Sequence, residues 1–151
     1  MIRAKGGIAV DILFFCRDAL YDSLVNNLIL ATSLRKVGKE VGIIFSGGVL
    51  HDLCQGVIRY PESMAGVDIR KTISVEAKSM GLSLQSSRDS KSLDIRPLLR
   101  QAKESGVLLY ACPIWSRLLN LSGKLPQELS VIALEKLLEE ITSCAKIIGG
   151  F

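Results

Sequence analysis

The chain has 151 residues, of which 48% are hydrophobic and 23% are charged, and its net charge is +4. A length of ~150 residues indicates one domain that buries about two-thirds of its unfolded surface. This composition excludes disordered and low-complexity fibrous chains. The mean hydropathy of +0.34 is high for a monomer, and we interpret the excess as a core plus a subunit interface.

No stretch of the sequence predicts a membrane span. The longest apolar runs, 12–16 and 107–112, are far shorter than the ~18–20 residues that a spanning helix needs. The first seven residues and the apolar run after them lack the features of a signal peptide. We therefore expect a cytoplasmic protein without a membrane partner.

Basic residues outnumber acidic ones between Arg70 and Lys103. They are not interleaved with aromatic residues and match no nucleic-acid-binding motif, so no nucleic-acid partner is expected. Two interpretations stay open for the surplus: a solvated face plus a loop, or an electropositive rim that attracts an acidic partner.

Residues 8–16 are apolar and β-rich, which is typical of a strand buried on both faces in a parallel sheet. A helix follows that either Asp22 or Ser23 can cap and that Gly38 ends. Its apolar stripe is wider than that of an ordinary amphipathic helix, so we expect a second apolar neighbour.

A second strand is predicted over residues 40–45, followed by the turn at 46–48. A short helix then passes through His51 and Cys54. Residues 55–65 are predicted to form a loop because of their proline and polar content.

The middle of the chain predicts a helix over residues 67–80, a short strand over 82–84 and a polar loop over 86–92. Asp94 is expected to cap the next helix, which Gly106 closes. The side of the first of these helices that we expect to be buried carries Ile69, Ile73, Ala77 and Met80.

The last third predicts a buried strand over 107–111, a helix over 113–121 and a short strand over 130–132. A helix over 133–143 and a closing strand over 146–151 complete the chain. The helix is expected to bury Leu134, Leu137, Leu138 and Ile141 and to leave Glu135, Glu139 and Glu140 outside.

This alternation predicts a single three-layer α/β/α domain over residues 1–151, with a mainly parallel sheet of about five strands. In such a sheet the site lies beyond the carboxyl ends of the strands. Three features fall at that edge: Cys16, the glycine pair within 46–48, and Cys112. The glycine pair lacks the lysine of a phosphate loop and indicates a tight turn, so no nucleotide cofactor is expected.

Cys112 is the strongest candidate for a functional residue. It separates a buried strand from a helix whose first residue is Pro113, a preferred position for proline. As the N-cap residue, its sulfur would lie near the amides of Ile114, Trp115 and Ser116, where an anion is stabilised and a thiolate or persulfide is favoured. A small buried residue filling the strand end is the alternative. Trp115 could shield the sulfur or dock a partner.

The other three cysteines have weaker patterns. Cys54 follows His51 by three residues, which permits either a nucleophile pair or an exposed histidine beside a packed thiol. Cys144 is most simply a core residue. Cys16 could serve as a second thiol if it neighbours Cys112. No C-x-x-C pair occurs, so neither a zinc site nor a disulfide framework is expected.

Several segments carry a family resemblance: the first strand, 26–31, 38–41, 45–49, 106–113 with positions 116 and 118–119, and the ending 145–151. In these segments the chain resembles the DsrE-like family of small sulfur-relay proteins. The resemblance implies a persulfide carried on Cys112, sulfur donor and acceptor proteins as partners, and homo- or hetero-oligomers. Ser116 departs from the family pattern, because it follows the cysteine by four residues rather than three.

We therefore expect a sulfur-relay protein that carries sulfane sulfur on Cys112, supported by Pro113, Trp115 and Ser116, without a metal or organic cofactor. One alternative is a thiol-dependent redox or peroxide-reducing protein, with Cys16 as the resolving thiol. The other is a non-catalytic oligomeric assembly module in which Cys112 is only packing.

Overall fold

The computed structural model describes residues 10–18, 20–86 and 92–149. The strands of the main sheet are β1 (Ile12–Cys16), β2 (Val41–Phe45), β6 (Leu108–Ala111), β7 (Ser130–Val131) and β8 (Lys146–Gly149). All neighbours pair in parallel, in the order β7-β6-β2-β1-β8. The predicted five-stranded parallel sheet is therefore confirmed, although its first strand begins at Ile12, and residues 8, 9, 150 and 151 of the predicted outer ends lie outside the described part.

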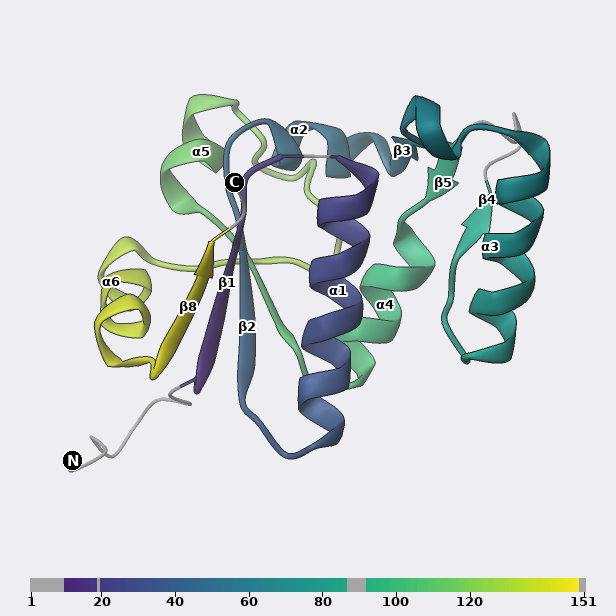
Figure 1. Ribbon diagram of the computed structural model, residues 1–151. Helices are drawn as coiled ribbons and strands as arrows, with labels where there is room; N and C mark the ends of the chain where they lie inside the picture. The colour runs from purple at the N-terminus through teal and green to yellow at the C-terminus, as the bar shows by residue number, and fades with distance from the viewer. Residues whose placement is uncertain (1–9, 19, 87–91, 150–151) are drawn as a thin grey trace.

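Helices cover both faces of this sheet. The helices within the described residues are α1 (Tyr21–Lys36), α2 (Gly48–Gln55), α3 (Val67–Ser79), α4 (Arg96–Glu104), α5 (Pro113–Leu118) and α6 (Leu134–Ser143). Figure 1 shows α1 and α4 on one side of the sheet and α6 on the other. This is the three-layer arrangement that the alternation of elements predicts.

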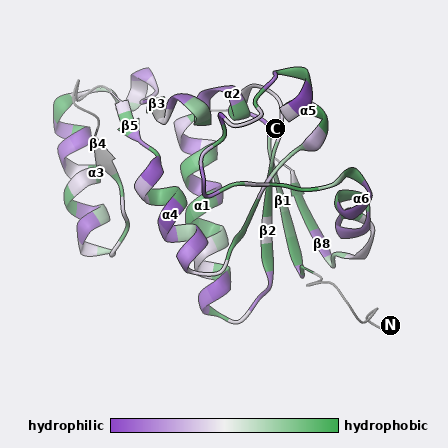
Figure 2. Cartoon of the chain, turned by 180° about the vertical axis from the view of Figure 1, so that it is seen from behind, coloured by the Kyte–Doolittle hydropathy of each residue, from purple (hydrophilic) through white to green (hydrophobic). Residues whose placement is uncertain are grey.

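The core lies against the central strand β2, whose five residues are all buried. Figure 2 shows the same strand and β1 as mostly hydrophobic, which is typical of strands covered on both faces. The α1 helix packs against this sheet and also against α4, which is the second apolar neighbour that its wide stripe predicts. Gly38, with a φ of +85°, follows the end of α1 as expected.

The predicted start of α1 is wrong by two or three residues. The helix begins at Tyr21 and its N-cap is Leu20, not Asp22 or Ser23, and no side chain caps it. Tyr21 is buried against Tyr60, with ring centroids 4.6 Å apart. This contact between segments distant in sequence explains why a local capping pattern placed the start too late.

A second, three-stranded antiparallel sheet is present that the sequence did not indicate. Its strands are β3 (Val57–Arg59), β4 (Gln85–Ser86) and β5 (Ser92–Asp94), in the order β3-β5-β4. The prediction of a continuous loop over 55–65 is therefore wrong, as is the strand over 82–84; a 3-10 turn, η1 (Glu62–Met64), also falls in that loop. Such short strands exist only through pairing with distant segments. Of the polar loop predicted over 86–92, residues 87–91 lie outside the described residues.

The α3 helix forms where expected, but its predicted buried side is largely exposed. Ala77 is its only buried residue, and Ile73 is partly buried. Ile69 and Met80, on the same side, are exposed. Figure 1 shows why: α3 lies at the far end of the molecule from α6, beyond the small sheet, so most of its surface meets no other element.

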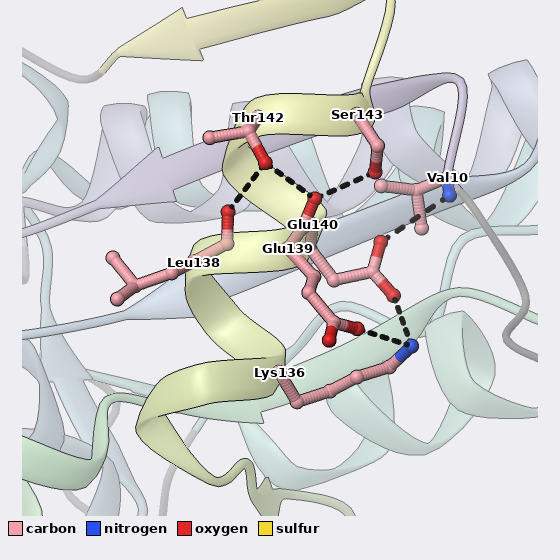
Figure 3. Close-up of polar contacts among 7 residues, drawn as sticks. All are labelled: Val10, Lys136, Leu138, Glu139, Glu140, Thr142 and Ser143. Carbon is pink, nitrogen blue, oxygen red and sulfur yellow. Dashed lines mark hydrogen bonds and ion pairs between the residues drawn. The ribbon is translucent and has the colours of Figure 1, made fainter. Parts of the chain in front are cut away.

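The expectation that Glu140 lies outside is also wrong. Its side chain is buried, at 2% exposure, and one carboxylate oxygen accepts the Val10 N–H at 3.3 Å. The other oxygen lies 3.7 Å from Lys136 Nζ (Figure 3). Leu137 is buried one turn earlier, whereas Leu138 is 52% exposed. The buried side of α6 is thus rotated from the predicted one, because Glu140 satisfies a backbone N–H just before β1.

The closing strand β8 forms one edge of the sheet in the part of the chain that the structure describes, and all four of its residues are exposed. Ile147 and Ile148 are among them. A strand at the edge leaves one row of backbone groups without a sheet partner. No helix within the described residues is long and apolar enough to cross a membrane.

Candidate functional site

Three features predicted to meet at one edge of the sheet do so. Cys16, Phe45 and Ala111 are aligned at the ends of β1, β2 and β6. The Ser46 N–H donates to the Cys16 carbonyl at 3.0 Å, and the Cys112 N–H donates to the Phe45 carbonyl at 2.9 Å. These bonds continue the sheet by one residue and hold both cysteines at its carboxyl edge.

The glycine pair at this edge forms the tight turn that the sequence predicts. Gly47 has a φ of +68° and is the N-cap of α2. A side-chain Cβ at this position would lie 3.6 Å from the Arg17 carbonyl. The positive φ, rather than a shortage of space, is what requires glycine here.

Cys112 is the N-cap of α5, and Pro113 is the first residue of that helix, as predicted. The residue is buried, with 8% exposure. It makes no capping hydrogen bond to the first-turn amides, which differs from the expected contact with them. The helix ends at Leu118 rather than at residue 121, because Asn120 adopts a φ of 50°, in the left-handed region that ends helices.

Ser116 lies one turn after Cys112. Its backbone N–H donates to the Cys112 carbonyl at 2.9 Å. The side chain is 9% exposed, and its hydroxyl oxygen is buried without a hydrogen-bond partner among the described residues. Leaving a buried hydroxyl unpaired is unfavourable by about 1–3 kcal/mol, so this group calls for an explanation.

The other face of α5 is exposed and apolar. It carries Ile114, Trp115 and Leu118, and Trp115 is 41% exposed. Part of the Trp115 side chain is therefore available to a partner. Exposed aromatic residues of this kind are enriched in protein interfaces.

Cys16 is buried on the side of the sheet that α1 covers, with 1% exposure. Burial raises the pKa of its thiol to about 11; a hydrogen bond from the Asn27 side chain acts in the opposite direction. Sequence reasoning missed Asn27, a buried polar residue within the apolar stripe of α1. Its place one turn after Leu24 on the helix was the available signal.

The structure does not bring Cys16 and Cys112 together. Cys16 is the last residue of β1 and Cys112 follows β6, and β2 lies between those two strands. Two strand spacings of about 4.8 Å each place the two Cα atoms ~10 Å apart, beyond the ~7 Å that a disulfide requires. Cys112 is also one residue past the position aligned with Cys16, so the alternation of side chains points the two thiols to opposite faces.

The remaining cysteines lie in separate places. Cys54 is partly buried on α2, and its pKa is raised by burial, against a lowering by the charge of Lys124. The exposed His51 ring contacts Asp52 at 3.3 Å. Cys144 is partly buried between α6 and the amino end of β8, and burial raises its pKa. Within the described residues, no three His, Cys, Asp or Glu side chains are grouped to hold a metal ion.

Comparisons with known proteins support the architecture. No family model and no curated protein matches the sequence. The chain is similar in structure to the ychN protein of E. coli. The TM-score is 0.56 at 16% sequence identity, and the match covers 93% of this chain and 99% of ychN. Because ychN has a DsrE-like fold, the match shows that the chain has a fold consistent with that one. A structural similarity at 16% identity shows the fold. The chemistry has to be argued from the residues of the site.

Proposed function

We propose that this chain is a sulfur-relay protein that carries sulfane sulfur as a persulfide on Cys112. The observation that carries the proposal is the position of this thiol. It lies at the carboxyl edge of a parallel sheet, at the start of α5, where sites in open α/β sheets occur. The ychN-like fold and the resemblance to the DsrE-like family support the same conclusion.

Loading and release are two exchanges of the same kind. The Cys112 thiolate attacks the outer sulfur of a donor persulfide, R–S–SH; the donor S–S bond breaks, and the donor leaves as the thiolate RS⁻. The product is Cys112–S–SH. An acceptor thiolate then attacks this outer sulfur, which frees the Cys112 thiolate and gives a persulfide on the acceptor. No oxidant, metal or organic cofactor enters either step.

The exposed face of α5 supports a protein as the donor or acceptor. Ile114, Trp115 and Leu118 are exposed on the helix that begins directly after Cys112, a residue with 8% exposure. A partner that packs against this face would bring its own thiol to the start of the helix. Aromatic anchors such as Trp115 commonly provide a large share of binding energy in interfaces.

The distance between Cys16 and Cys112 argues against the redox alternative in its intramolecular form. A peroxide-reducing cycle needs a resolving thiol that can reach the oxidised one. Here an intervening strand separates the two thiols and burial raises the pKa of Cys16. A carrier needs only one accessible thiol, and this is the chemistry that the geometry favours.

The test is the intact mass of the protein after incubation with a small persulfide donor such as glutathione persulfide. We expect one added sulfur atom that a reductant removes and that maps to the peptide containing Cys112. Cys112→Ser should take up none. Cys54→Ser, which removes a partly exposed thiol elsewhere, should load like the wild type. Sulfur retained in Cys112→Ser, or found on Cys54, would contradict the proposal.

We also propose that the chain forms a homo-oligomer through the end of the molecule that carries α6 and β8. Leu134, Leu138, Ile147 and Ile148 are exposed there, and apolar surface of this kind is typical of interfaces. Antiparallel pairing of two β8 strands about a two-fold axis would place each Lys146 opposite a glycine of the second copy. Two β8 strands can therefore pair in this way without placing the two Lys146 side chains opposite each other.

A further inference from the structure

The hydroxyl of Ser116 has no role in the fold that the described residues reveal. Its oxygen is buried and unpaired, whereas the hydroxyls of Ser33, Ser105 and Ser143, on other helices or at their ends, donate to carbonyls of their own helices. A serine that bonds to the preceding turn is the common solution inside a helix. Ser116 does not adopt it, although its backbone is helical.

The direction of this hydroxyl follows from the helix geometry. The bond from the Ser116 N–H to the Cys112 carbonyl shows that one full turn separates the two residues. A helical side chain leans back toward the turn before it, so the Ser116 side chain leans toward Cys112, the N-cap residue one turn earlier. Ser116 and Cys112 are both buried, so the two side chains lie on the inner face of this turn.

We infer that the Ser116 hydroxyl is the hydrogen-bond donor that holds the outer sulfur of a Cys112 persulfide. In the thiol form it makes no hydrogen bond to Cys112. A persulfide adds a second sulfur about 2.05 Å beyond the first, which gives the acceptor a reach that the thiol lacks. This sulfur becomes an anion when the persulfide loses its proton. A hydrogen bond to an anion is stronger than one to a neutral group. This inference rests on the proposed function.

The test compares the wild type with Ser116→Ala in both forms of the protein. In the thiol form, Ser116→Ala should melt at the same temperature as the wild type or higher, because an unpaired buried hydroxyl is removed. In the persulfide form it should melt lower. The pH midpoint for alkylation of the Cys112 persulfide should rise by about one unit, a tenfold loss of anion stabilisation. A packing role alone would not move this midpoint.

Ser105→Ala is the matched control, since its hydroxyl bonds within its own helix away from the site. It should leave the midpoint in place. Ser116→Thr keeps the hydroxyl and should restore most of the wild-type value. If the wild type loads sulfur on Cys112 but Ser116→Ala shows an unchanged midpoint, this inference is wrong and the proposed function stands. If the wild type takes up no sulfur, both fail.

Discussion

Cys16 illustrates how burial can make a thiol unreactive by raising its pKa. With a pKa of about 11, compared with an ordinary 9.0, only about 1% of this thiol is ionised at pH 9, compared with about half in an unfolded chain. Because the thiolate is the reactive form, Cys16 should react about fifty-fold faster with an alkylating reagent at pH 9 in denaturant than in the folded protein. Peptide mass spectrometry over time measures this ratio. Equal rates in the two states would refute the effect of burial.

The same shift makes the stability of the fold depend on pH. Since the folded state holds the Cys16 proton more tightly, its contribution is complete below pH ~9 and is lost as the pH rises toward 11, by about 2–3 kcal/mol in total. Cys16→Ala removes the titrating group. Its free energy of unfolding, from urea titrations, should therefore fall less steeply between pH 9 and 10.5 than that of the wild type. Parallel curves would show that other groups cause the decline.

At the scale of elements, the docking of α6 combines a buried polar contact with the burial of Leu137 from its apolar stripe. Glu140 accepts the Val10 N–H and lies within ion-pair distance of Lys136 (Figure 3). Burial raises the pKa of Tyr110, and the negative charge of Glu140 raises it further. The carboxylate therefore links α6 to the start of β1 and lies near β6.

We predict that Glu140→Ala lowers the free energy of unfolding by about 1–3 kcal/mol, because the buried Val10 N–H loses its acceptor. Glu139→Ala, one residue earlier and exposed, is the matched control and should change it by less than ~0.5 kcal/mol. Urea unfolding curves of the three proteins provide the comparison. Equal effects of the two substitutions would mean that the contact with Val10 does not stabilise the fold.

For the whole molecule, strand order decides which thiols can meet. Because β2 lies between β1, which ends at Cys16, and β6, which Cys112 follows, we predict that mild peroxide treatment of the folded protein forms no disulfide between the two cysteines. Non-reducing digestion and mass spectrometry would detect one. Its appearance before unfolding would restore the two-thiol redox cycle as the better account of the site.

The two ends of the molecule differ in a way that matters for assembly. Figure 1 shows α6 and β8 at one end and α3 at the other. Exposed apolar side chains occur at both ends, including Leu138 and Ile147 at the first and Met80 at the second. A sheet edge can extend into a second copy, which is why we assign self-association to the β8 end.

Light scattering at micromolar concentration should therefore give a multiple of 16.4 kDa. Leu138→Glu and Ile147→Glu should each reduce that mass, because a charge would be buried in the interface. Val131→Glu, on the exposed edge strand β7, is the control and should not. A monomeric wild type would contradict self-association, and dissociation by the control alone would move the interface to the other edge.

Features that depend on neighbouring residues could be predicted from the sequence by itself. The alternation of strands and helices, the tight turn at Gly47, the start of α5 at Pro113 and the wide apolar side of α1 all follow from local pattern. Because parallel strands bring their carboxyl ends to one edge, this pattern was also sufficient to place Cys16 and Cys112 at the same edge. The physical reason is that backbone conformation and hydrophobic periodicity act over a few residues.

Only the tertiary structure decided what depends on strand order and on distant partners. It separated Cys16 from Cys112 by one strand, and it paired the short segments of the small sheet. It also placed Glu140 inside and left most of α3 outside, and at these positions the two helices depart from their apolar pattern. A helix buries the side that finds a partner, and a buried backbone N–H such as that of Val10 can select a carboxylate over a leucine. These choices are made by contacts between segments far apart in the chain, which no local pattern records.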